Sequence, residues 1–112
     1  MSAITISINV DQAAATTASL IAAVTGYKVE VVSMCLSVFG GIGTVKSTLQ
    51  DITANTVRAT LVGSATVPAV YTHHGKDGNP AFSTALDEGV ELVTGAAVTI
   101  TGWMTYRRVP YA

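Results

Sequence analysis

The strongest constraint on the fold of this chain is a two-residue alternation of apolar and hydroxyl side chains. It is clearest near the C-terminus. There one set of alternate positions is apolar, namely Val98, Ile100, Met104 and Tyr106, and the other set carries three threonines and a tryptophan, namely Thr99, Thr101, Trp103 and Thr105. Successive side chains of an extended strand point to opposite faces. The pattern therefore predicts a half-buried β-strand over residues 97–106.

Similar apolar segments, separated by turns about every ten residues, return along the rest of the chain. We expect further strands over residues 3–10, 20–24, 28–39, 44–49, 57–62, 66–72, 82–86 and 90–93, the candidate at 82–86 being short. Val, Ile and Thr dominate these segments, as a pleated and half-buried surface favours. We find no convincing helical periodicity. About eight short strands spaced in this way predict an all-β antiparallel sandwich or barrel.

The core should come from one face of the strand at 28–39 and one face of the last strand. Its expected members are Val32, Met34, Leu36, Val38, Val98, Ile100 and Met104.

The N-terminal segment carries a strand signal of its own. Ile4, Ile6, Ile8 and Val10 alternate with polar residues, and the small residues 11–19, DQAAATTAS, are typical of a linker or an extended arm. Nine extended residues reach up to ~30 Å. Such a strand can pair with its own sheet or with the open edge of another subunit.

These observations divide the chain into two parts. Residues 1–16 form an N-terminal strand and arm, and residues 17–112 form the β-sandwich domain. We expect residues 1–10 to pair with a neighbouring chain, because main-chain pairing links subunits without side-chain chemistry.

The charge content indicates an assembled protein. Charged residues make up 12% of the chain, about half of the roughly 25% that is usual for soluble domains. A net charge of −1 without a basic stripe argues against nucleic acid as a partner. No apolar run approaches the ~20 residues of a membrane helix, and residues 1–24 lack the pattern of a signal peptide. The single cysteine, Cys35, allows no intrachain disulfide.

The stretch HHGKDGNPAF, residues 73–82, contains most of the candidate chemistry. His73 and His74 are adjacent, so in an extended chain they point to opposite faces and cannot easily bind one metal ion. The GKDGNP part has the composition of a tight turn.

Other candidate sites are equally weak. Cys35 has no basic neighbour that would activate its thiol. Asp87 and Glu88 belong to the sequence DEG, which predicts a turn rather than a catalytic carboxylate pair. The sequence thus predicts no catalytic residue, no metal site, no cofactor and no enzyme activity.

Several residues remain as candidates for contact with a partner. Trp103 is either a lid at the edge of the sandwich or an interface anchor, since aromatic residues are common at interface hot spots. Arg107 and Arg108 either meet carboxylates of a partner or are solvated. The complete set is Ile4, Ile6, Ile8, Tyr71, His73, His74, Trp103, Arg107 and Arg108.

Two segments carry a resemblance to a known family. IAAVTGYKVEVVSMCLS, residues 21–37, and FSTALDEGVELVTGAAVTITGWMTYRRV, residues 82–109, resemble the opening and the ending of small tailed-phage virion proteins. The resemblance covers residues 20–109. It implies a jelly roll of two four-stranded sheets and a structural virion component, often a trimer on the capsid surface, with no catalytic residues to carry over.

The expected function is that of a capsid decoration, or cement, protein. It would assemble in the host cytoplasm as a homotrimer, bind the major capsid protein of the virion and strengthen the phage head. The alternative is a receptor- or carbohydrate-binding module of a tail fibre, which would use Trp103, Tyr71 and the polar loop at 73–79 as its binding surface.

Overall fold

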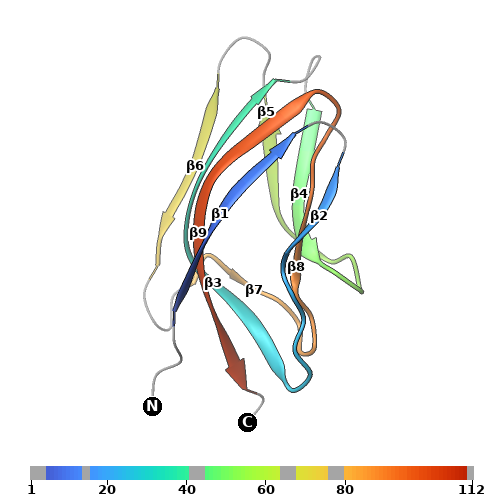
Figure 1. Ribbon diagram of the computed structural model, residues 1–112, viewed down its shortest axis with the longest axis vertical. Coiled ribbons are helices and arrows are strands. Elements are labelled where there is room, and N and C mark those ends of the chain that lie inside the picture. The colour runs from blue at the N-terminus through green and yellow to red at the C-terminus, as the bar shows by residue number, and fades with distance from the viewer. Residues whose placement is uncertain (1–4, 14–15, 41–44, 64–67, 76–79, 111–112) are drawn as a thin grey trace.

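Two antiparallel β-sheets pack face to face in the structure, a computed structural model that describes residues 5–13, 16–40, 45–63, 68–75 and 80–110. Within these residues there are nine strands (Figure 1): β1 (Ile6–Ala13), β2 (Thr17–Ile21), β3 (Tyr27–Gly40), β4 (Val45–Asp51), β5 (Val57–Gly63), β6 (Ala69–His74), β7 (Phe82–Ser83), β8 (Val90–Val93) and β9 (Val98–Pro110). The prediction of an all-β antiparallel sandwich is confirmed. No helix among the described residues is long and apolar enough to cross a membrane.

The strand order is that of a jelly roll. Sheet A has the order β1-β9-β3-β6, with the short β7 paired to the other end of β3, and sheet B has the order β2-β8-β4-β5. Consecutive strands therefore cross repeatedly from one sheet to the other, as two interleaved Greek keys require. β5 and β6 lie at one side of the sandwich, and β1 and β2 lie at the opposite side (Figure 1).

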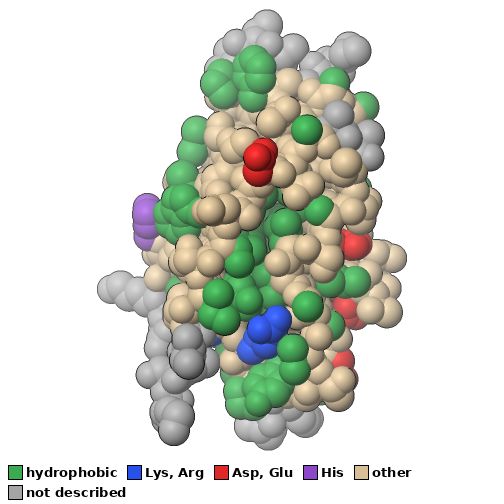
Figure 2. Space-filling model, viewed as in Figure 1, with side chains coloured by type: hydrophobic (Ala, Val, Ile, Leu, Met, Phe, Trp, Pro, Cys, Tyr) green, Lys and Arg blue, Asp and Glu red, His purple; other side chains and the backbone are tan. Residues whose placement is uncertain are grey.

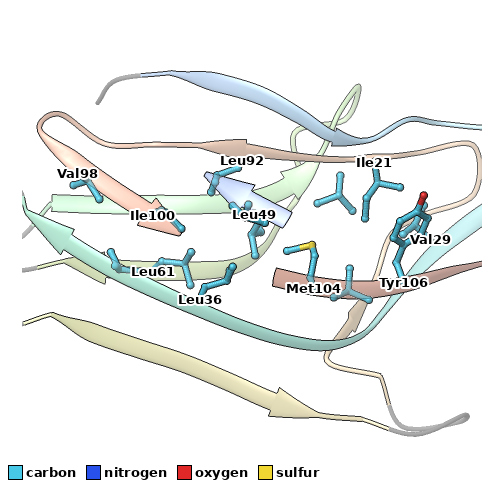
Figure 3. Packing of buried hydrophobic residues seen from close by; sticks show 14 residues of the cluster. Ile21, Val29, Leu36, Leu49, Leu61, Leu92, Val98, Ile100, Met104 and Tyr106 are labelled. Atoms are coloured by element: carbon cyan, nitrogen blue, oxygen red, sulfur yellow. The ribbon is translucent and has the colours of Figure 1, made fainter. Parts of the chain in front are cut away.

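The core fills the space between the sheets with aliphatic side chains from both (Figure 3). From sheet A come Val10, Val29, Val31, Leu36, Val38, Val98, Ile100, Met104 and Tyr106, and from sheet B come Ile21, Leu49, Leu61, Val90 and Leu92. The alternation that predicted the last strand is confirmed, since its even-numbered residues from Val98 to Tyr106 face this core, except where Gly102 has no side chain.

The predicted inner face of β3 needs one correction. Leu36 and Val38 are fully buried as expected, and Met34 packs against the core. Val32 is buried, as expected, at 7% exposure, but it lies outside the core cluster, to which Val31 belongs. A β-bulge between Val31 and Ser33 shifts the register against β9. An extra residue in one strand reverses the alternation beyond it, so a pattern carried through the whole strand misplaces Val32.

The N-terminal segment also differs from the expectation. β1 extends to Ala13 and β2 begins at Thr17, so the expected linker at 11–19 is mostly strand. β1 pairs with β9 of its own chain from Ile6↔Tyr106 to Ala13↔Thr99. The prediction that this segment pairs with a neighbour is therefore wrong for this edge of β1, because pairing with β9 lets Ile8 and Val10 join the core of their own chain.

Candidate functional site

The outer face of sheet A gathers the candidate contact residue Trp103 and its neighbours. Trp103 pairs with Asn9 of β1 on one side and with Cys35 of β3 on the other, and Cys35 pairs with Thr72 of β6. Trp103 is half-buried in this row, and Met104, the next residue along β9, points into the core. The outward orientation expected for Trp103 is thus confirmed.

Rows of small side chains flank the row of Trp103. Together they form what we call the Trp103 face: Ser7, Thr105, Ser33 and His74; Asn9, Trp103, Cys35 and Thr72; Asp11, Thr101, Ser37 and Val70; Ala13, Thr99 and Phe39. Asp11 is the one carboxylate among these described residues, and none of them is a lysine or an arginine.

The chemistry of this face suits contact with another macromolecule. Ser and Thr hydroxyls are cheaper to remove from water than full charges, and Trp103 offers a large apolar surface with one N–H donor. Phe39 and Val70, exposed at 47% and 62%, add apolar area near one end of the face. Depletion of charge around an aromatic centre is the composition of interface cores.

Arg107 lies at the border of the Trp103 face and is engaged within the chain. Its Nη2 atom lies 2.6 Å from Glu30 Oε1, and its Nε donates to the same oxygen at 2.7 Å. The side chain is buried. Arg107 is therefore neither solvated nor available to a partner's carboxylate, the two alternatives considered from the sequence.

Arg108 points toward the side of the sandwich between β1 and β2. Its Nη2 donates to the Ala22 carbonyl oxygen at 2.9 Å, and its guanidinium lies 5.4 Å from the centre of the Tyr106 ring. Its buried Nε has no hydrogen-bond partner among the described residues. The arginine thus ties β9 to the segment that follows β2, which is a structural role.

Tyr71 belongs to the interior and not to an outer surface. It packs against the core, and its hydroxyl oxygen accepts from Val62 N at 2.8 Å and donates to Val62 O at 3.3 Å. The hydroxyl therefore connects β6 of sheet A to β5 of sheet B. Tyr71 and Trp103 lie on opposite faces of sheet A, so they cannot form the shared stacking surface expected for the receptor-binding alternative.

The two histidines end β6 and, as expected, occupy neighbouring positions with opposite orientation. His73 pairs with Met34, which faces the core side, and the exposed His74 pairs with Ser33 on the Trp103 face. Among the described residues, no three His, Cys, Asp or Glu side chains gather as a metal site would require. Residues 76–79 of the predicted GKDGNP turn lie outside the described residues.

The predicted contact residues of the N-terminal strand face inward. Ile8 packs against the core and Val10 is buried, whereas Ile6, near the end of β1, is 41% exposed. Ile4 lies outside the described residues.

The carboxylates that could have formed a catalytic pair instead hold turns. Glu88 accepts from Thr53 N at 2.8 Å and Ala54 N at 3.1 Å, and Asp87 accepts from Gly26 N at 2.6 Å. The turn predicted for Asp87 is present, with a φ of 65° at this residue.

A third carboxylate, Asp51, lies fully buried beside the same corner and forms a bidentate pair with Arg58. The hydrogen bonds that Arg58 donates to Asp51 raise the pKa of its guanidinium above the usual value, against the opposing effect of desolvation. Because these carboxylates have internal partners, the structure leaves the Trp103 face as the strongest candidate site.

The sequence analysis found Trp103 but missed its neighbours Asn9, Cys35 and Thr72. Each of them occupies a polar position in a strand that alternates polar and apolar residues, and this alternation could have marked them as facing outward. The row that they share depends on the pairing of four strands that are distant in sequence.

Comparison with known proteins adds a likeness in fold. No protein-family model matches this chain, and no curated protein matches it. Among solved structures, it is similar to a chain of Bacillus endospore appendages, described as a novel family of disulfide-linked pili, with a TM-score of 0.52 and 19% identity over 97% of this chain and 88% of that chain. At this identity the likeness concerns the β-sandwich fold alone.

Proposed function

We propose that this protein is a structural subunit that decorates the head of a tailed phage, where it binds the assembled major capsid protein and stabilises the shell. The observation that carries the proposal is the Trp103 face, a broad surface of small hydroxyl residues around one tryptophan with little charge. The resemblance of residues 21–37 and 82–109 to small tailed-phage virion proteins supports the location on the phage head.

The mechanism is added interface area rather than chemistry. Four strands about 4.8 Å apart, carrying rows about 6.8 Å apart, give the Trp103 face an area of roughly 500 Å². A stable interface buries about 800 Å² on each partner. One copy would therefore bind weakly through this face, and an oligomer that engages several sites at once would bind far more tightly.

This requirement for several copies agrees with the homotrimer expected from the sequence. Light scattering of the purified protein at micromolar concentration should give a mass three times the 11.5 kDa of one chain. A stable single chain in solution, together with isolated copies on particles, would contradict the trimer.

A receptor- or carbohydrate-binding module of a tail fibre is the second candidate. Trp103 favours it, because the half-buried indole lies on the outer face beside Asn9 and Thr101, where it could stack on a sugar ring with hydrogen-bonding groups around it. The inward orientation of Tyr71 weighs against it, since the surface then has one tryptophan and no second aromatic in its row.

A filament of the kind named for the structural neighbour is less favoured. A filament in which disulfides join every subunit to a neighbour on either side would require at least two cysteines in each subunit. Cys35 is the only cysteine in these 112 residues, so it can join one chain to one other chain and no further.

Cryo-electron microscopy of particles purified from an infected host would test the proposal. We expect hundreds of copies on the head at symmetric positions of the capsid lattice. A few copies at the tail would instead support the receptor-binding candidate, and particles without the protein would contradict both.

A matched pair of variants would test the role of the Trp103 face on such heads. Trp103→Ala should weaken binding to heads that lack the protein by about thirty-fold or more, as loss of a hot-spot residue worth about 2 kcal/mol predicts. Thr60→Ala, at an exposed position of β5 in sheet B, is the control and should bind normally. Equal binding of the two variants would exclude the Trp103 face as the docking surface.

A further inference from the structure

The outer edge of β1 is an open strand edge. Within the described part of the chain β1 is the terminal strand of sheet A and pairs with β9 alone over its eight residues. It contains no proline, lysine or arginine, and its one charged residue is Asp11. Natural sheets protect such edges with those residues, with bulges or with a covering segment, because unpaired N–H and C=O groups can pair with another chain.

The other sheet edges carry such protection. The Tyr71 hydroxyl forms hydrogen bonds with both the backbone N–H and the backbone C=O of Val62 on β5, and the same strand carries Arg58. β2 is five residues long and its register shifts within them. β6 follows Pro68 and ends in two histidines. β1 is therefore the longest edge without protection among the described strands.

Apolar side chains lie beside this edge. Ile6 is 41% exposed, and Ile8 and Leu20 are partly buried between the two sheets, against the core. Figure 2 shows apolar side chains gathered along the middle of the face that carries β1 and β2 in Figure 1. A partner strand added to β1 would cover part of this surface as well as satisfy its backbone.

We propose that β1 pairs with β1 of a second copy of this chain, antiparallel and centred on Asn9. A two-fold axis perpendicular to the sheet keeps the inner side chains of both copies on the same side of the joined sheet. Even-numbered residues must therefore oppose even-numbered residues, and odd-numbered residues must oppose odd-numbered ones. Centring on Asn9 places Ile8 opposite Val10 on the inner face. On the outer face it places Ser7 opposite Asp11 and the two Asn9 amides opposite each other.

The charges permit this register. Each Asp11 carboxylate opposes a Ser7 hydroxyl, which can donate to it. The two Asp11 residues stand four positions apart along the strand, about 13 Å, beyond the ~10 Å over which salt screens exposed charges. The chain thus supplies a complementary partner in itself, and the closed two-fold contact limits further growth.

The pairing joins the two sheets A into one continuous sheet and the two Trp103 faces into one surface. This inference rests on the proposed function only in requiring that copies of the chain associate. A trimer built through other surfaces leaves β1 free, so β1 pairing would then link one trimer to the next, as a cementing protein requires.

Disulfide trapping tests the register directly. In a Cys35→Ala background, Asn9→Cys places the two introduced thiols opposite each other, within the Cα separation of 4.4–6.8 Å that a disulfide needs. Mild oxidation of the purified protein should give at least ten times more covalent dimer on a non-reducing gel than Thr60→Cys in the same background. Equal cross-linking of the two variants, or none in either, would overturn the proposal.

A charge substitution gives an independent test. Asn9→Lys places two ammonium groups opposite each other and should weaken self-association at least ten-fold by analytical ultracentrifugation, whereas Thr60→Lys should leave it unchanged. If Asn9→Lys associates like the wild-type protein, β1 is not the contact. These measurements use purified protein without particles, so a failure of β1 pairing is seen separately from a failure of head binding, which Trp103→Ala tests.

Discussion

Replacing Asp51 with alanine should destabilise the fold strongly, because its carboxylate connects three segments from a fully buried position. Oδ1 accepts from Arg58 Nε at 2.9 Å, and Oδ2 accepts from Arg58 Nη2 at 2.8 Å and from Ala85 N at 3.2 Å. Asp51 ends β4, Arg58 belongs to β5, and Ala85 lies between β7 and β8. The substitution would therefore loosen the corner of the sandwich where these segments meet.

The magnitude follows from what the substitution leaves behind. Removing one partner of a buried ion pair costs about 3–5 kcal/mol. Ala85 is exposed, so its N–H can bond to water once the carboxylate is gone and adds little to this loss. The Arg58 side chain is 28% exposed, so its guanidinium can recover part of its hydration when the carboxylate is removed. We therefore expect a loss at the lower end, about 3 kcal/mol.

Urea denaturation followed by the fluorescence of Trp103, the one tryptophan in the chain, would measure this loss. Asp11→Ala, at an exposed carboxylate of β1, is the control and should change the free energy of unfolding by less than about 0.5 kcal/mol. The double variant Asp51→Ala, Arg58→Met should be more stable than Asp51→Ala alone, since it leaves no unpaired cation. A loss below about 1 kcal/mol for Asp51→Ala would refute this reasoning.

Three further predictions concern the core, the close pairing of β9 with β3 at Gly102, and the histidines. Leu36→Ala should cost about 2–5 kcal/mol in the same denaturation experiment, because the side chain is fully buried, and a change below about 0.5 kcal/mol would contradict its placement. Gly102→Ala should cost about 1–3 kcal/mol, because Gly102 has a φ of 148° and an added methyl group would meet the Cys35 carbonyl oxygen; wild-type stability would disprove this contact. Chelator should leave the melting temperature unchanged both in the wild-type protein and in His73→Ala, His74→Ala, and a chelator-sensitive melting temperature in the wild type alone would point to a metal.

The strands and the fold class were predictable from the sequence because their signal is local. The strand expected at 90–93 is β8. The strand expected at 28–39 is one residue shorter than β3 at each end, and the strand expected at 57–62 is one residue shorter than β5 at its C-terminal end. Alternation within a strand also placed Trp103 outward, since each side chain direction follows from that of its neighbour.

Register and sheet order depend on contacts between residues that are distant in sequence. The bulge at Val32 arises where β3 pairs with β9. Because of it, Val31 belongs to the core cluster in place of the expected Val32. The same pairing buries Arg107 against Glu30, although the sequence shows only two adjacent arginines near a strand end.

The sequence by itself determined that this chain forms short strands with one apolar side, and its low charge favoured assembly. The tertiary structure decided which strands became edges, and thus that β1 joins its own sheet while its outer edge stays open. It also decided that Tyr71 protects β5 instead of facing a partner. The physical reason is that alternation is set residue by residue along one strand, whereas pairing is chosen by how all the strands bury their apolar sides together.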